Sequence, residues 1–265
     1  MVKSQISMPD ARAWLAGLSR RGWAWEFLRR SPEYRRAFEC RDEGDSSPAK
    51  WGLLGFEDPD VDALHADVFW RIEDCAEVLP MALNRDVNLS TGVTLNLEGL
   101  SCRVSFLKYE MTSRTDILFC ESGRFLQIAI LGNGDLSGAN LVVPALDGPN
   151  SIMARTASLR RLNDLLFNKH MRHVLYPPES RAPRLTNVLF ALDGWLAHKP
   201  QREIAATMFG NARVEREWND PRENLRDRVR RAIGYGQALM NGDYRRFLRL
   251  TFARRIAAMQ GTPRG

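Results

Sequence analysis

The stretch REIAATMFG, residues 202–210, decides how the C-terminal part of this chain folds. It has the pattern of the second helix of a helix-turn-helix unit, with Pro200 placed for the first helical turn and Gly210 placed to end the helix. Ile204 and Ala205 fall on its inward face, where a small alanine lets a preceding helix come close. Such a unit continues after a short turn into a recognition helix, so the residues after Gly210 determine whether the chain has one.

The next amphipathic helix is delayed, because residues 211–224 carry no apolar stripe of helical period. Asp220 is then a natural N-cap, Pro221 a natural first helical residue, and Glu223 stands where the acid of a capping box belongs. We expect the helix to run to Met240 and to end at the Asn-Gly pair that follows. The pattern therefore predicts a helix-turn-helix unit with an extended turn.

The delayed helix has an apolar face and a basic face. At 100° per residue the apolar stripe is about 120° wide, and it consists of Leu225, Val229, Ala232, Ile233, Gly236, Leu239 and Met240. The polar face carries Arg226, Arg230 and Gln237 on one flank and Arg228, Arg231 and Tyr235 on the other. One buried cluster of the unit is predicted to contain Trp195, Ile204, Met208, Val229 and Ile233.

Residues 243–259 predict a further basic amphipathic helix, with Arg245, Arg246 and Arg249 directed outward. Guanidinium groups bind phosphates and read guanine edges. The expected DNA contacts are therefore Arg226, Arg228, Arg230, Arg231, Gln237, Arg245, Arg246 and Arg249.

The charge of the chain is unevenly distributed. Its net charge of +6 combines 16 basic against 22 acidic residues up to residue 154 with 22 basic against 10 acidic residues from residue 155 onward. The second part therefore carries +12, which is more than solubility requires and favours a polyanion as partner. Together with the helical pattern, this charge predicts binding to double-stranded DNA.

The composition, with 44% hydrophobic and 26% charged residues, is that of a soluble globular protein. No apolar run approaches the ~20 residues that span a bilayer, and the N-terminus lacks a signal-peptide core. A cytoplasmic protein without membrane contact is therefore expected. Cys40, Cys75, Cys102 and Cys120 are widely spaced, which favours buried thiols over disulfides or zinc ligands.

The sequence contains no catalytic constellation, and neither an enzyme nor a cofactor is expected. It has no nucleophile elbow, P-loop or dinucleotide fingerprint, and the glycine-rich residues 131–140 predict a hairpin turn. His170 and His173 have the spacing of a metal pair, but no further ligands lie near them in the sequence. Asp116 and Glu121 are isolated carboxylates.

The rest of the chain divides into two further regions. Residues 23–39 predict two short helices joined at Ser31, a good N-cap that Pro32 follows in the first helical position. Short β-branched or alternating runs between glycine-rich turns predict an antiparallel sheet further along, and from Ser158 the period becomes helical. The predicted fold class is α+β. It comprises a helical N-terminal interaction module (1–56), a β-rich middle region (57–154) and an all-α extended-turn helix-turn-helix domain (155–265).

The N-terminal module carries more aromatic side chains than so small a unit can leave exposed to water. Trp25, Phe27 and Tyr34 would form a contiguous exposed patch unless another part of the chain covers them, so they are expected at an interdomain contact. The basic C-terminal part is the natural partner by charge, through Glu26 and Glu33. Docking on the middle sheet is the alternative.

Two motifs resemble one known family. WEFLRRSPEYRR, residues 25–36, is similar to the opening module of FseA-type transcriptional activators of proteobacterial integrative and conjugative elements, in which the Ser31 position is commonly Asn. QREIAATMFG and LRDRVRRAIGYGQALMNGDYRRFLR, within residues 201–249, resemble the extended-turn helix-turn-helix domain of the same family. The similarity covers residues 14–50 and 183–249.

The resemblance implies a DNA-binding activator of genes for element excision and conjugative transfer. It also implies that the C-terminal domain holds the N-terminal module, and that an antiactivator protein can bind this module in its place. The alternative is a non-DNA-binding regulatory module that itself acts like an antiactivator. The presence of both modules and of a basic C-terminal part favours the activator.

Overall fold

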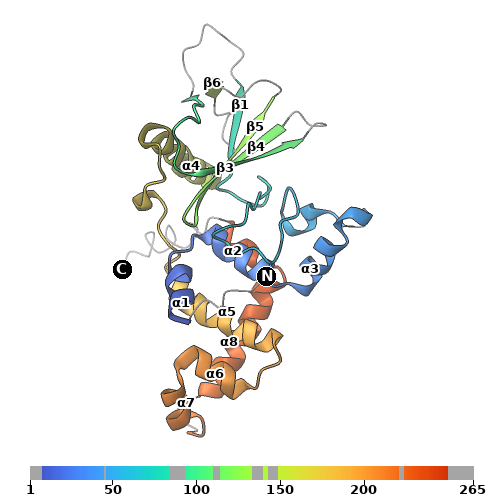
Figure 1. The fold of residues 1–265 in the computed structure, drawn as a ribbon, viewed down its shortest axis with the longest axis vertical. Coiled ribbons are helices and arrows are strands. Elements are labelled where there is room, and N and C mark those ends of the chain that lie inside the picture. Colours follow the sequence, from blue (N-terminus) through green and yellow to red (C-terminus); the bar gives the residue numbers. More distant parts are fainter. Residues whose placement is uncertain are drawn as a thin grey trace, which may run out of the picture.

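The computed structural model describes residues 8–44, 46–83, 93–109, 114–132, 140–142, 149–220 and 224–249 (Figure 1). Its α+β fold confirms the predicted class. The sheet and one long helix form one end of the molecule, the C-terminal helices form the other, and the N-terminal helices lie between them (Figure 1).

Short helices build the N-terminal part: α1 (Met8–Ala16), α2 (Arg20–Leu28), α3 (Pro32–Glu39), and the 3-10 helices η1 (Arg41–Glu43) and η2 (Pro48–Trp51). The predicted cap of α3 is confirmed, because the side chain of Ser31 accepts a hydrogen bond from the backbone N–H of Tyr34 and Pro32 opens the helix. Ser19 caps α2 in the same way. Helix α1 is an element that the sequence analysis does not predict.

The middle part forms a six-stranded sheet in the order β2-β6-β1-β5-β4-β3. Its strands are β1 (Leu79–Leu83), β2 (Val93–Thr94), β3 (Arg103–Tyr109), β4 (Arg114–Glu121), β5 (Arg124–Leu131) and β6 (Asn140–Val142). The predicted antiparallel pairing holds for β3 with β4, β4 with β5, and β6 with both β1 and β2, but β1 and β5 run parallel. Strand β1 escapes prediction because Pro80 lacks a backbone N–H and argues against a central strand.

Both faces of the sheet are covered. Helix α4 (Pro149–Asn168) lies on one face, where Leu162 shares a core with Ile117 (Figure 1). On the other face Phe69 shares a smaller core with Phe125. Because α4 begins before residue 154 and packs on the sheet, the structure joins the end of the predicted middle region to the start of the next. The three-part division itself stays a prediction.

The C-terminal part consists of η3 (His173–Leu175), α5 (Ala182–Leu196), α6 (Gln201–Phe209), α7 (Asn211–Glu217), α8 (Leu225–Met240) and η4 (Asp243–Phe247). Helix α6 ends at Gly210 as predicted, with φ of 87°. All residues of the predicted apolar stripe of α8 are buried, and α8 packs on α5 and α6. One hydrophobic core joins these helices to the N-terminal ones, since Trp23 and Phe27 belong to the same cluster as Val229.

The expected extended turn contains a helix. Helix α7 exposes most of its surface and buries Val214, while Arg213 pairs with Glu217 at 2.6 Å. A two-turn helix with one buried side chain has no apolar stripe by which to predict it.

The predicted start of the recognition helix is also wrong. Helix α8 begins at Leu225, and its N-cap is Asn224 in the left-handed conformation rather than Asp220. Pro221 and Glu223 lie outside the described residues. Tertiary contacts of Leu225 in the core therefore outweigh the local capping signal.

Two further predictions need correction. Trp195 is 40% exposed, whereas Ile204, Met208, Val229 and Ile233 share one core as predicted. The reason is that α6 meets α5 at Gly194, and Trp195 is turned about 100° away from that contact. The segment after Gly242 starts as the 3-10 helix η4 instead of an amphipathic α-helix, and its continuation from residue 250 lies outside the described residues.

Two glycines decide how closely the helices approach. At Gly236 of α8, an added Cβ would lie 3.3 Å from the carbonyl oxygen of Val188 in α5. At Gly194 of α5, it would lie 2.7 Å from Cγ1 of Ile204 in α6. Gly234 of α8, by contrast, faces open space.

These distances predict opposite effects for two identical substitutions. Gly194→Ala should lower the free energy of unfolding by about 1–3 kcal/mol, because the packed core has to shift. Gly234→Ala, the matched control, should raise it by about 0.5–1 kcal/mol through helix propensity alone. Urea denaturation of both variants measures the difference. Equal stabilities would contradict the close approach of α5 and α6.

Candidate nucleic-acid interface

The polar face of α8 does not pack into the hydrophobic core. Arg226, Arg228, Arg230 and Arg231 are all exposed on the first half of the helix, while Gln237 is half-buried on the second half. Since α5 and α6 cover the opposite side of α8, the arginines project from the surface of the helical unit. This is the geometry in which a recognition helix meets a groove.

Three arginines of this surface lie on aromatic rings. The guanidinium of Arg226 stands 5.3 Å from the ring centroid of Trp218, and that of Arg228 stands 4.5 Å from Phe209. Arg184 of α5, which the sequence analysis does not single out, stands 5.6 Å from Tyr235 of α8. Cation–π contacts restrict the rotamers of the long side chains and hold their charges in place. No local sequence pattern marks Arg184, because only the packing of α5 brings it beside the second flank of α8.

The remaining polar contacts of α8 are local. Arg226 donates from Nη2 to the side-chain oxygen of Asn219 at 3.2 Å. Arg230 pairs with Asp227, one turn earlier on the same helix. Arg231 forms no ion pair with any residue that the structure describes. The positive charge of the flanks is therefore offset only by Asp227 on the helix itself.

The arginines of η4 lie at the other end of α8. Arg226 lies near the start of α8, and the part of the helix from Arg226 to Met240 is about 21 Å long. Arg245 donates to the backbone oxygen of Lys50 and covers the ring of Tyr244, so the N-terminal module holds it. Arg246 is exposed and pairs with Asp243 at 2.7 Å, and Arg249 is exposed as well. The structure thus divides the predicted DNA contacts into two groups.

The three aromatic residues predicted at an interdomain contact are buried. Phe27 stacks on Phe247 of η4, with ring centroids 6.2 Å apart and planes at 3°. Trp25 donates its indole N–H to the carbonyl of Val61 at 3.0 Å, and the hydroxyl of Tyr34 donates to the carbonyl of Glu57 at 2.7 Å. Phe27 therefore meets the C-terminal helices, while the other two meet the segment that leads to the sheet.

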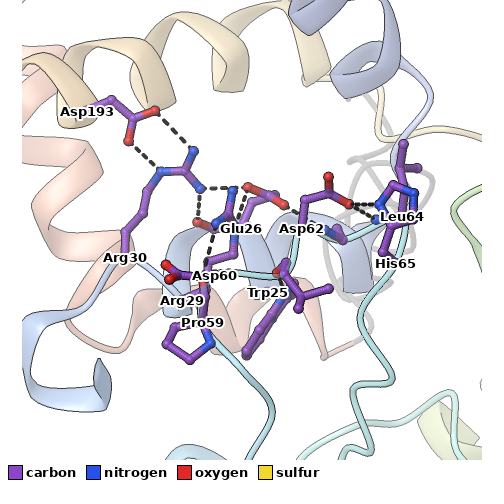
Figure 2. Close-up of polar contacts among 12 residues, drawn as sticks. Trp25, Glu26, Arg29, Arg30, Pro59, Asp60, Asp62, Leu64, His65 and Asp193 are labelled. Carbon is purple, nitrogen blue, oxygen red and sulfur yellow. Dashed lines mark hydrogen bonds and ion pairs between the residues drawn. The ribbon is translucent and has the colours of Figure 1, made fainter. Parts of the chain in front are cut away.

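An ionic network fastens the N-terminal module to helix α5 (Figure 2). Arg30 binds both carboxylate oxygens of Asp193, at 2.5 and 3.0 Å, and also the carboxylate of Glu26 at 2.6 Å. Burial alone would lower the pKa of Arg30, but the charges of Asp193 and Glu26 outweigh it and raise that pKa. Glu26 is fully buried and accepts the backbone N–H of Ala63 at 2.8 Å with its second oxygen.

Helix α1 holds helix α6 directly. Arg12 donates to the carbonyl oxygens of Thr207 and Met208, at 3.0 and 3.3 Å, and to the side chain of Asn187 at 3.1 Å. These carbonyls belong to the last turn of α6, which has no backbone N–H donors within the helix for them. The N-terminal module therefore completes the C-terminus of the second helix of the unit.

Glu57, whose backbone contacts the hydroxyl of Tyr34, has a carboxyl group with a shifted pKa. Burial, helped by the neighbouring charge of Asp67, raises the pKa of Glu57 to about 7. The backbone of the same residue accepts the Tyr34 hydroxyl and donates to it. The folded protein therefore favours the protonated form of this carboxyl group.

The residues described contain neither a cluster of metal ligands nor a helix that could span a membrane. Among them, no three His, Cys, Asp or Glu side chains gather to hold a metal ion, and His170 and His173 are both exposed. Cys75, Cys102 and Cys120 are buried thiols outside any disulfide, and Cys40 is half-buried. In the same part of the chain, no helix has both the length and the apolar character needed to cross a membrane.

Comparison with known families agrees with this geometry. Residues 143–249 match the model of a family described as "T6SS, Transcription factor, DNA binding domain", and residues 7–54 match that of a "Proteobacterial transcriptional regulator-like domain". No curated protein matches the chain. The first match runs to the end of the described C-terminal helices, and the second covers α1 to η2. The two domains indicate a DNA-binding transcriptional regulator.

The aromatic supports predict an effect on DNA binding at residues that need not touch DNA. Phe209→Leu and Trp218→Leu should each weaken binding about two- to fivefold, the equivalent of about 0.5–1 kcal/mol for an exposed cation–π contact. Phe167→Leu is the control, because Phe167 is 84% exposed on α4. Fluorescence anisotropy with a duplex at low salt measures the affinities. Unchanged affinity in both variants would show that the rings do not position the arginines.

The raised pKa of Glu57 predicts a pH dependence of stability. Because the folded pKa is about 7 against 4.5 in the unfolded chain, this group lowers the free energy of unfolding as pH rises from 4.5 to about 7. Glu57→Gln should remove that slope and leave the variant more stable than the wild type at alkaline pH. Glu39→Gln, which makes the same exchange at an exposed position of α3, is the control. Parallel pH profiles of wild type and Glu57→Gln would contradict the assignment.

Proposed function

We propose that this chain is a transcriptional activator that reads duplex DNA with α8 and controls genes for excision and conjugative transfer of a mobile element. One observation carries the DNA-reading part: four exposed arginines occupy the first half of α8, opposite its buried stripe. Arg226 and Arg230 form one flank, and Arg228 and Arg231 the other. A helix with two basic flanks suits a groove whose two walls are phosphate backbones.

The activator role and the target genes follow from the family resemblance. The N-terminal motif and the helix-turn-helix motif occur in one chain, as they do in FseA-type activators. As a partner we propose an antiactivator protein that binds the N-terminal module, in addition to double-stranded DNA. Such a protein would have to replace the stacking of Phe27 on Phe247 and the pairing of Arg30 with Asp193. A non-enzymatic regulator acting in the cytoplasm fits both partners.

Salt dependence separates the roles of the arginines. The Arg226→Ala/Arg230→Ala double variant of the full-length protein should bind duplex DNA more weakly, and each lost phosphate contact should lower the salt slope by about one. A lost base contact should instead cost about 1–3 kcal/mol and relax specificity at one position. Arg160→Ala, on the exposed face of α4, is the matched control for charge. Binding isotherms at several salt concentrations give both quantities.

Two outcomes would overturn parts of this proposal. Wild-type affinity and salt slope in a folded double variant would remove this flank from the interface. Absence of any DNA binding by the wild type at low salt would instead favour the non-DNA-binding, antiactivator-like module. Mapping the bound sites in the genome tests the target genes, because they should lie beside excision and transfer genes of an integrated element.

A further inference from the structure

A buried arginine at the centre of the molecule has fewer partners than its charge requires. Arg21 of α2 is 4% exposed, and its Nη2 donates to Oε1 of Gln127 at 2.7 Å. Its Nε and Nη1 are buried too, and they meet no acceptor in the described part of the chain. Two of its donor groups therefore lack an acceptor among the residues described, and a buried donor without an acceptor is costly.

The surrounding groups do not neutralise this charge. Gln127 also bonds to Asp116 at 3.0 Å, but both oxygens of Asp116 already accept from Arg114, at 2.6 and 3.0 Å. Cys75 and Cys120 feel the charge of Arg21, yet burial raises the pKa of both and keeps them as thiols. Arginine itself cannot release its proton inside a protein. A buried cation of this kind needs a countercharge.

A small cavity lies beside Arg21. Its volume is about 10 Å³, and its walls include Trp25 of the same helix, Val68 and Trp70 of the following segment, and Phe125 of β5. Such a volume leaves room for a single small guest. Arg21 is the one charged residue among those that line it.

We infer that this cavity binds one compact monovalent anion of the size class of chloride, held by the guanidinium of Arg21. An anion supplies an acceptor and the missing countercharge together, whereas a water molecule supplies the acceptor alone. The small volume excludes phosphate, sulfate and sugar acids. Because the walls come from α2, the segment 63–70 and β5, the bound anion stabilises the junction between the N-terminal helices and the sheet. This site is independent of DNA binding.

Thermal unfolding of the full-length protein tests the inference when chloride replaces gluconate at constant ionic strength. The melting temperature of the wild type should rise by roughly 2–4 °C. Arg21→Met, which keeps the length of the side chain and removes its charge, should lose this dependence. Without chloride it should be at least as stable as the wild type, because an unpaired buried charge is gone. Arg160→Met removes the same charge from the surface and should keep the wild-type dependence.

Crystallography with bromide in place of chloride gives a direct answer that does not depend on how the variant folds. An anomalous peak beside the guanidinium of Arg21 is the expected result. Density of a water oxygen without anomalous signal would overturn the inference. A chloride dependence of the same size in the wild type and in Arg21→Met would overturn it as well.

Discussion

The burial of helix α2 on all its sides is the constraint on which the arrangement of this molecule depends. Every residue from Arg21 to Leu28 is buried, although the helix has only nine residues and would be unstable alone in water. Trp23, Trp25 and Phe27 each remove a large apolar surface from water, and each contributes on the order of 1.5–3 kcal/mol. The sheet, the segment after η2 and the C-terminal helices all pack around this helix, so its position sets theirs.

Arginine side chains of the N-terminal helices also stabilise that arrangement, because they donate hydrogen bonds to oxygens of the C-terminal helices. Arg20 donates to the carbonyls of Arg246, Phe247 and Arg249, at 2.7, 3.1 and 2.6 Å, and so ends the C-terminal helical segment. Arg12 does the same for the last turn of α6, and Arg30 clamps α5 through Asp193. Guanidinium groups suit this task because their planar forks bind several oxygens at once. The N-terminal module is thus a structural part of the helix-turn-helix unit, and any partner that displaces it acts on the core behind α8.

This use of arginine also changes how the charge of the chain is interpreted. The excess of basic residues after residue 154 predicts a polyanion partner, but some of these side chains bind other groups of the protein itself. Arg181 donates to both carboxylate oxygens of Glu179, at 2.9 and 3.1 Å, and Arg245 donates to the backbone oxygen of Lys50 in η2. Among the exposed arginines, Arg226 and Arg228 of α8 and Arg184 of the adjoining α5 are held over aromatic rings. Net charge indicates the class of partner, whereas the placement of each guanidinium decides which ones can meet it.

The sequence by itself determined the elements whose signals are local and periodic. The α8 stripe, the stop at Gly210 and the Ser31 cap follow from spacing and side-chain chemistry, and the structure has them as predicted. Only the tertiary structure decided the features that rest on distant contacts. Strand β1 exists despite Pro80 because β5 and β6 pair with it, and α7 forms without an apolar stripe. Arg184 lies over Tyr235 beside the basic face of α8, whereas Arg245 binds the backbone oxygen of Lys50. Both positions depend on neighbours far away in the chain, which no local pattern encodes.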